Sequence, residues 1–308
     1  MRKRPSDKFG LKTILLVVCL MAFFFFPASC LHAQTVAVQQ GQKGCLWSIQ
    51  TRTNKIYLLG ALHFFRQDAY PLGDTIKRAY SDSRMLVFET NIDAMQDPAV
   101  QARMMKLGMY PEGQNLLPKL DEKTRRSLEK KLDEFGLPIE AFSRFKPWMV
   151  AIQIEVVQLL SLGFSPEHGI DVHFFNKAKT DGKEIGFLES TEFQISLLGK
   201  MVEQDQNALL KQTLKELENA DDMAAGLIKF WKAGDSDRLH DLLSKSFKGY
   251  PDLYDRLLIQ RNKNWIQEIE SAMRLNKNVL FVVGAGHLVG PESVVDLLKK
   301  KGYQVKQQ

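Results

Sequence analysis

Short apolar runs rich in strand-forming residues stand near both ends of the sequence, and longer stretches with a helical spacing of apolar positions lie between them. Near the start, "CLWSIQT" and "IYLLGALH" are joined by the polar residues 52–55, which predicts a β-hairpin. The other strand-like runs are "LVFETN", "KEIGFLES", "NVLFVVGAGH" and "YQVKQ". This pattern predicts an α/β fold, with a central mixed sheet built from both ends of the mature chain, which begins after residue 33.

The middle of the chain predicts a large helical insertion, mainly over residues 91–181 and 191–275. In "LDEKTRRSLEKKLDEFG" the leucines recur on one helical face, and Asp121 is placed to cap the first turn. "PWMVAIQIEVVQLLSLG" is apolar nearly all round and predicts a buried helix, because Gln153 and Glu155 inside it argue against a membrane span. "YPDLYDRLLIQRNKNWIQEIESAMRLN" predicts one long helix before the last two strands.

The N-terminus, residues 1–33, has the pattern of a secretory signal peptide: basic residues come first, an apolar run follows, and small residues end at Ala33. The apolar run is shorter than a membrane span normally requires. Removal of this segment leaves a polar, flexible arm over residues 34–44 and a single domain over residues 45–306. We therefore expect a periplasmic or secreted protein with no membrane span after signal removal.

A lipoprotein anchor is the alternative interpretation of the same region. Ala28-Ser29-Cys30 resembles the end of a lipoprotein box, in which Cys30 would be lipidated and would hold the protein at a membrane surface. Pro27 stands where such boxes usually carry leucine, and this weakens the lipoprotein interpretation.

Charge and cysteine content exclude two further possibilities. Of the 42 basic and 36 acidic residues, five basic and one acidic lie within residues 1–33, which leaves a mature net charge of about +2. No basic stripe is present, so we expect no nucleic acid partner. Cys45 is the only cysteine beyond residue 33, so an intramolecular disulfide is excluded and a hydrophobic core must stabilise the fold.

Two of the predicted strands end in the same Gly-x-x-His motif, with Gly60 before His63 and Gly284 before His287. Glycine lets the backbone leave a sheet sharply, or lets another group approach closely. The crevice at the C-terminal ends of strands is where α/β sheets bind ligands, and a histidine there serves as a metal ligand or as a general acid or base. A histidine after a strand also caps or fills a core, but two such motifs favour a shared site.

Carboxylates end two further strands, since Glu89 follows "LVF" and Glu189 follows "GFL". Two histidines and one carboxylate are a common ligand set for a catalytic divalent metal that keeps one position for water. We therefore predict that the side chains of His63, Glu89 and His287 converge, with Glu189 as a secondary candidate. The alternative for Glu89 is a helix cap or an ion pair with a lysine.

Three more polar residues are candidates: Arg261 for a catalytic role, and Asn262 and Asp171 as secondary candidates. Arg261 and Asn262 lie beside the apolar face of the predicted long helix, from which they would hold a carboxylate or an oxyanion; a solvated helix face is the alternative. Asp171 lies between His168 and His173. We expect Asp171 to cap the helix that follows, and a metal-binding role for the two histidines is the alternative.

The stretches "LLGALHFFRQDAYPL", "LVFETN", "GKEIGFLES", "RNKNW" and "VLFVVGAGHLVG", in this order, resemble the TraB/GumN family, whose animal relatives are the Tiki proteases. The resemblance covers about residues 45–306. This family shares paired Gly-x-x-His turns, an acidic residue after an early strand and an arginine in a late helix. The residues that match are His63, His287, Glu89 and Arg261.

The resemblance implies a metal-dependent hydrolase, peptidase-like as in the Tiki branch, with Mn, Co or Zn as cofactor and a peptide or small molecule as substrate. His63 and His287 would hold the metal, Glu89 would be a third ligand or the base, and Arg261 would stabilise developing negative charge. One alternative is a non-catalytic envelope protein that binds a peptide, haem or a metal in the same cleft. Another is an interaction protein whose histidines only shape turns.

The export signal gives a first testable prediction. Because the small residues end at Ala33, the secreted protein should begin at Gln34 and carry no lipid. Intact-mass and N-terminal measurements on protein recovered from the cell envelope check this directly. A diacylglyceryl group on Cys30 would refute the soluble form and place the protein at a membrane surface.

Overall fold

The computed structural model describes residues 43–247 and 250–308. The predicted signal peptide, Cys30 and residues 34–42 of the predicted arm lie outside the described residues. Within the two described ranges, no helix is both long enough and apolar enough to cross a membrane.

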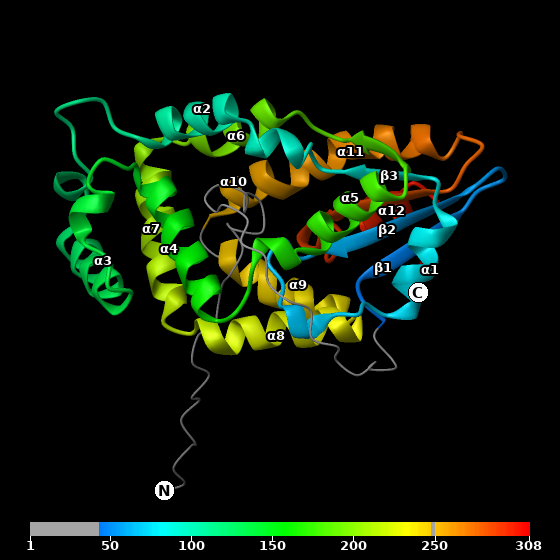
Figure 1. Ribbon diagram of the computed structural model, residues 1–308, viewed down its shortest axis with the longest axis horizontal. Helices are drawn as coiled ribbons and strands as arrows, with labels where there is room; N and C mark the ends of the chain where they lie inside the picture. The colour runs from blue at the N-terminus through cyan, green and yellow to red at the C-terminus, as the bar shows by residue number, and fades with distance from the viewer. Residues whose placement is uncertain (1–42, 248–249) are drawn as a thin grey trace, which may run out of the picture.

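A six-stranded mixed sheet organises the fold (Figure 1). Its strands are β1 (Leu46–Gln50), β2 (Lys55–Ala61), β3 (Met85–Phe88), β4 (Glu184–Phe187), β5 (Val279–Gly284) and β6 (Val305–Gln307). They lie in the order β4-β3-β5-β2-β1-β6. The β4-β3, β3-β5 and β5-β2 pairs are parallel, whereas β1 pairs antiparallel with β2 and β6. The predicted α/β class, with a mixed sheet built from early and late segments, is confirmed.

Strand β5 is the last of the parallel strands in the sequence, but in the sheet it lies between β2 and β3. All of its residues are buried, as expected for a parallel strand covered on both faces. The register pairs Ala61 with Gly284, and Phe88 with Val282. The C-terminal ends of β2, β3 and β5 therefore lie side by side, and the turns that follow them start from one edge of the sheet.

Helices between β3 and β5 form the predicted insertion. They are α2 (Pro98–Gly108), α3 (Glu122–Glu134), α4 (Pro147–Ser161), α5 (Ile170–Thr180), α6 (Thr191–Gly199), α7 (Glu203–Leu217), α8 (Ala220–Ala233), α9 (Ser236–Ser244), α10 (Pro251–Tyr254) and α11 (Gln260–Ala272). Outside the insertion, α1 (Asp74–Asp82) precedes β3 and α12 (Val294–Lys300) follows β5. In Figure 1, α3, α4 and α7 stand at the end of the molecule away from the sheet. Asp121 caps α3 as predicted, because its side chain accepts a hydrogen bond from the backbone of Thr124.

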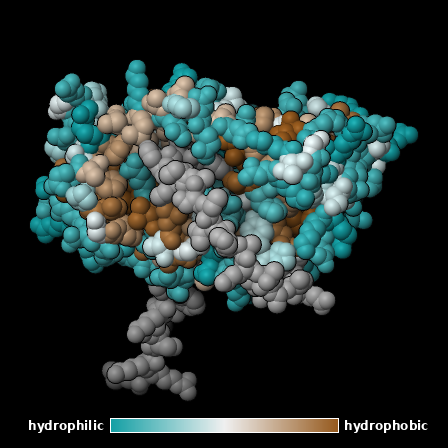
Figure 2. Space-filling view, in the orientation of Figure 1, coloured by the Kyte–Doolittle hydropathy of each residue, from teal (hydrophilic) through white to brown (hydrophobic). Residues whose placement is uncertain are grey.

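Two helices differ in part from the sequence prediction. Most of α4 is buried, but Val156, Val157 and Leu160 are only half-buried, and the space-filling view shows apolar side chains on the surface in the region of α4 and α7 (Figure 2). The predicted long helix before β5 is interrupted by a π-helical turn, Asp255–Ile259, between α10 and α11. A π turn inserts one residue without changing the apolar composition, so the sequence pattern did not reveal it.

Helix α8 is hydrogen-bonded to the first Gly-x-x-His turn. The indole of Trp231 is fully buried, and its Nε1 donates a hydrogen bond of 2.6 Å to the carbonyl oxygen of Gly60. The ring also packs edge-on against Phe65, just beyond His63. The helical insertion thus fixes the end of β2 as well as covering it.

This contact can be tested by comparing two buried tryptophans. Trp231→Phe should lower the free energy of unfolding by about 1–3 kcal/mol more than loss of ring volume alone, because it removes a buried hydrogen bond to Gly60. Trp148→Phe is the matched control, since Trp148 is also fully buried but its Nε1 has no hydrogen-bond partner in the described part of the chain. Urea denaturation of both variants gives the difference. Equal losses would contradict a stabilising role for the indole hydrogen bond.

Candidate active site

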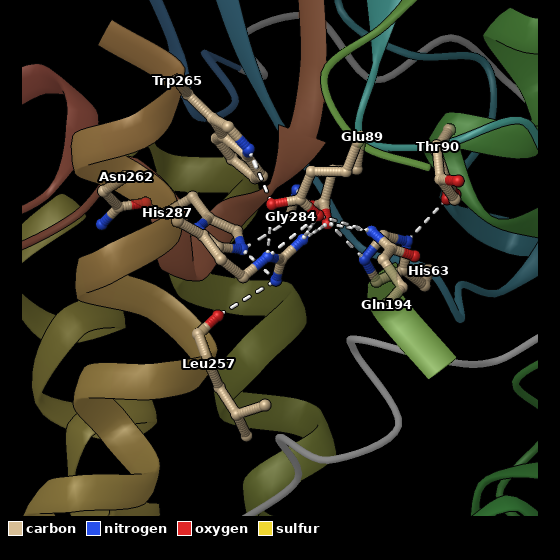
Figure 3. A network of polar contacts seen from close by, with 12 residues as sticks. His63, Glu89, Thr90, Gln194, Leu257, Asn262, Trp265, Gly284 and His287 are labelled. Atoms are coloured by element: carbon tan, nitrogen blue, oxygen red, sulfur yellow. Dashed lines mark hydrogen bonds and ion pairs between the residues drawn. The ribbon is translucent and has the colours of Figure 1, made fainter. Parts of the chain in front are cut away.

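Side chains from the ends of β2, β3 and β5 meet at one point (Figure 3). Nε2 of His63 lies 4.0 Å from Oε1 of Glu89, and Nε2 of His287 lies 3.9 Å from the same oxygen. All three side chains are buried. The structure therefore brings together the three residues that the sequence analysis expected to converge.

Gly284 leaves open the space between these three side chains. Its backbone N–H donates a hydrogen bond of 2.6 Å to Oε1 of Glu89. A Cβ atom at this position would lie 3.1 Å from Oε1 of Glu89, 3.3 Å from Nε2 of His63 and 3.6 Å from Cδ2 of His287. Any side chain here would fill the centre of the site, which explains glycine in the second motif.

Gly60 serves a different purpose, although it occupies the same place in the first motif. A Cβ atom there would lie 3.0 Å from the Cα atom of Ala285 and 3.1 Å from the Cβ atom of Cys45. Because glycine has no Cβ atom, the end of β2 packs closely against Ala285 and Cys45. The first glycine thus allows the strands to approach, and the second keeps the site open.

The ring of His63 is oriented by Asp171. Nδ1 of His63 lies 2.6 Å from Oδ2 of Asp171, and because a carboxylate only accepts, the proton of the neutral ring is on Nδ1. Nε2 then carries the lone pair, and this buried atom has no hydrogen-bond partner among the described residues. Burial lowers the pKa of His63, but the charge and hydrogen bond of Asp171, together with the charge of Glu89, outweigh burial and the pKa is raised overall.

The prediction that Asp171 caps α5 is wrong. The N-cap of α5 is Gly169, and Asp171 lies inside the first turn with its carboxylate turned to His63. A Cβ atom on Gly169 would lie 2.4 Å from the carbonyl oxygen of His63, so glycine lets the start of α5 approach the histidine turn. Backbone N–H of Ile170 also donates to the carbonyl of Leu62, which joins the two segments.

The ring of His287 is oriented by Asn262. Nδ1 of His287 lies 2.6 Å from Oδ1 of Asn262, whose amide nitrogen donates in turn to the carbonyl oxygen of Glu292 at 2.9 Å. The amide orientation makes Nδ1 the donor and leaves the lone pair on Nε2. Glu292 has a left-handed backbone with φ of 58°, uncommon for a residue with a side chain. Burial, and then the charge of Arg261, lower the pKa of His287 to about 3, so the ring stays neutral.

Arg261 is fully buried and connects the remaining parts of the site. Nε and Nη2 donate to Glu189, and Nη2 also donates to Oε2 of Glu89 at 2.6 Å. Nη1 lies 3.0 Å from both the carbonyl oxygen of Leu257 and Nε2 of His287. Burial raises the pKa of Glu89, but Arg261, the two histidines and the N–H of Gly284 together outweigh burial, and the pKa falls to about 2. Glu89 is therefore ionised at neutral pH.

Glu189, a secondary candidate, orients Arg261 rather than facing the space at Gly284. Its carboxylate accepts from Nε and Nη2 of Arg261, from Nε1 of Trp265 at 2.8 Å and from Nε2 of Gln194 at 3.2 Å. Gln194 also donates to Glu89 at 3.3 Å and thus joins the two carboxylates. A carboxylate with this many donors is fixed in place and holds its partner in one orientation.

Several contributors were not found from the sequence. Gln194 and Trp265 lie in helical segments whose pattern predicts only amphipathic helices, and the π-helical turn that carries the Leu257 carbonyl gave no signal. Such π turns often occur at functional sites. The two histidines beside Asp171 lie outside the centre: His168 accepts a hydrogen bond at its carbonyl from Tyr70, and the ring of His173 packs against Tyr70.

The atoms around Gly284 are of the kinds that divalent metal ions bind, but one of them is engaged by a hydrogen bond. Both rings present Nε2, and their Nδ1 atoms have the hydrogen-bond partners that metal-binding histidines usually have. Two ligands of one zinc ion lie no more than about 4.2 Å apart, because each bond is about 2.1 Å long, and Oε1 of Glu89 is within that distance of both histidines. That hydrogen bond is the one from Arg261 to His287. Within residues 43–247 and 250–308, no group of three or more His, Cys, Asp or Glu side chains is arranged so that it could hold a metal ion.

The fold and this centre define an α/β protein with two histidines and a glutamate at the C-terminal ends of parallel strands. The TraB/PrgY/gumN family model matches residues 45–307, and the chain belongs to this family. The resemblance noted from the sequence is confirmed.

Curated relatives are distant but extend over most of the chain. The chain is 22% identical over 306 residues to an uncharacterized protein of Treponema pallidum, covering 93% of this chain and 90% of that protein. It is 23% identical over 318 residues to metalloprotease TIKI2 of Xenopus tropicalis (87% and 60%) and 22% over 345 residues to metalloprotease TIKI1 of Danio rerio (94% and 68%). The match thus spans about 60% of the length of the frog protein. No solved structure matches the chain.

Proposed function

We propose that this protein is an exported metal-dependent hydrolase that cleaves an amide bond of a peptide. The observation that carries the proposal is the space at Gly284, which Nε2 of His63, Oε1 of Glu89 and the ring of His287 surround. Imidazole nitrogens and a carboxylate oxygen are the ligands that Mn, Co and Zn accept in hydrolases. The frog and fish relatives are both named as metalloproteases, which supports the same reaction class.

In this proposal the side chains at the strand ends hold the ion, and partners from the helices hold the side chains. His63 and His287 bind through Nε2, while Asp171 and Asn262 keep the protons on Nδ1. When bound, a divalent ion supplies a water nucleophile at neutral pH and polarises the scissile carbonyl. Glu89 is assigned as a third ligand because its Oε1 faces the same space as both histidine rings, and its lowered pKa keeps the carboxylate ionised.

Export is part of the proposal and rests on the sequence of residues 1–33, which lie outside the described ranges. A periplasmic or secreted enzyme without a lipid anchor is the form we propose. A peptide is the proposed substrate, with no nucleic acid partner, because the mature chain carries little net charge and no basic stripe.

Turnover should depend on both histidines. His63→Ala and His287→Ala each remove one proposed ligand and should abolish both metal retention and hydrolysis of a peptide library. The measurement uses chelator-treated protein with Mn, Co or Zn restored. Glu89→Gln should weaken metal retention as well as turnover, whereas retained metal with a roughly hundredfold lower rate would assign Glu89 as the base.

Full hydrolysis by chelator-treated protein, or by the His63→Ala variant, would refute the metal-dependent mechanism. Metal binding without hydrolysis of any peptide would leave the non-catalytic binding protein, for a peptide, haem or a metal, as the better description.

A methyl group at residue 284 should prevent metal binding without preventing folding. Gly284→Ala places a Cβ atom in the space between the three side chains and should abolish metal retention. Gly286→Ala is the matched control from the same turn, because its Cβ atom would find no atom nearer than 3.8 Å. Metal content after gel filtration, with circular dichroism to check the fold, gives the comparison. Normal metal retention by the Gly284→Ala variant would show that the ion does not bind in this space.

A further inference from the structure

Arg261 uses every one of its hydrogen-bond donors inside the protein. A guanidinium has five N–H donors. Nε–H and one Nη2–H serve Glu189, the other Nη2–H serves Glu89, and the two Nη1–H donors serve the carbonyl of Leu257 and Nε2 of His287. In this arrangement Arg261 therefore has no free N–H group with which to stabilise an oxyanion, the role predicted for it from the sequence.

One of these five hydrogen bonds competes with the proposed metal. A neutral imidazole has a single acceptor nitrogen, and Asn262 makes Nε2 that atom in His287. Nε2 cannot accept the Nη1–H of Arg261 and bind an ion with the same lone pair. Glu89 has no such conflict, because Oε2 accepts from Arg261 while Oε1 faces the space at Gly284.

The other contacts of Arg261 do not have to change. Glu189 accepts hydrogen bonds from Nε and Nη2, and the carbonyl oxygen of Leu257, in the π-helical turn, accepts one from Nη1. Glu189 lies in the turn after β4, and Leu257 lies in the π-helical turn just before α11, the helix that carries Arg261. Loss of the bond to His287 therefore releases one donor while the guanidinium stays clamped between Glu89 and Glu189.

We propose that Arg261 and the metal ion exchange at Nε2 of His287, so that metal binding frees one Nη1–H donor for the substrate. The inference rests on the proposed function. In the metal-free protein, Arg261 covers the lone pair of His287 and neutralises Glu89. With an ion held at Nε2 of His287, the Nη1–H of Arg261 would be free to donate to a substrate oxygen on which negative charge develops. The anion donor is thus offered only when the ion is present.

The exchange predicts that Arg261 weakens metal binding. Arg261→Lys keeps a positive charge between Glu89 and Glu189 but lacks the planar fork that reaches His287. This variant should bind Zn²⁺ or Co²⁺ about tenfold more tightly than the wild type, equivalent to about 1.4 kcal/mol. Calorimetric titration of chelator-treated protein measures the affinity. Arg256→Lys is the control, since Arg256 lies in the adjoining π-helical turn and pairs with Asp205 at 3.7 Å; its affinity should equal that of the wild type.

A measurement on the wild type tests the exchange even if Arg261→Lys does not fold. In metal-free protein, nitrogen-15 NMR should show coupling across the hydrogen bond from Nη1 of Arg261 to Nε2 of His287. Saturating Zn²⁺ should abolish this coupling and shift the Nε2 resonance, while Nε–H of Arg261 remains hydrogen-bonded.

The possible results separate the exchange from the proposed function. Zn²⁺ binding that is lost in the His63→Ala variant, with the Arg261–His287 coupling still present at saturation, overturns the exchange and leaves the metal site intact. Unchanged or weaker affinity in a folded Arg261→Lys variant also overturns it. Absence of Zn²⁺ and Co²⁺ binding by the wild type overturns both the exchange and the proposed function.

Discussion

One guanidinium between two buried carboxylates is the interaction on which the rest of this site depends. Arg261, Glu89 and Glu189 are all removed from water, and buried charges are tolerated only when they are paired and hydrogen-bonded. The three residues come from α11 and from the turns after β3 and β4, so this requirement fixes the helix against the ends of two strands. The carboxylate of Glu89 is consequently held with one oxygen toward Arg261 and the other toward the two histidines.

The helical insertion is part of the site as well as a cover for the sheet. Asp171 at the start of α5 sets the tautomer of His63, and Asn262 in α11 sets that of His287. Gln194 in α6 links Glu89 to Glu189, and Trp231 in α8 holds the carbonyl of Gly60. The strands supply the groups that face the central space, and the helices supply the partners that orient them. Hydrogen bonds from the helices therefore orient each group that faces the central space.

Much of the fold could be predicted from local patterns. Apolar runs of strand length, a polar hairpin turn and amphipathic stretches gave the α/β class and the helical insertion, because these patterns report which faces of a segment are buried. The Gly-x-x-His motifs at 60–63 and 284–287, together with Glu89 after an apolar strand, indicated a shared site, because the ends of parallel strands meet at one edge. The turn at Asp171 was misinterpreted as a cap, since an acidic residue near a helix start has that role more often than it pairs with a distant histidine.

By itself, the sequence determined the elements, their order and the polar residues at the strand ends. Only the tertiary structure decided that β5 inserts between β2 and β3, and this placement brings His63, Glu89 and His287 around Gly284. It also decided that the two glycines have different roles, that a π-helical turn precedes Arg261, and that Arg261 has no free donor. The physical reason is the range of the interactions: periodicity along the chain records burial of neighbouring residues, whereas these contacts join residues that are distant in sequence and depend on how the strands are ordered.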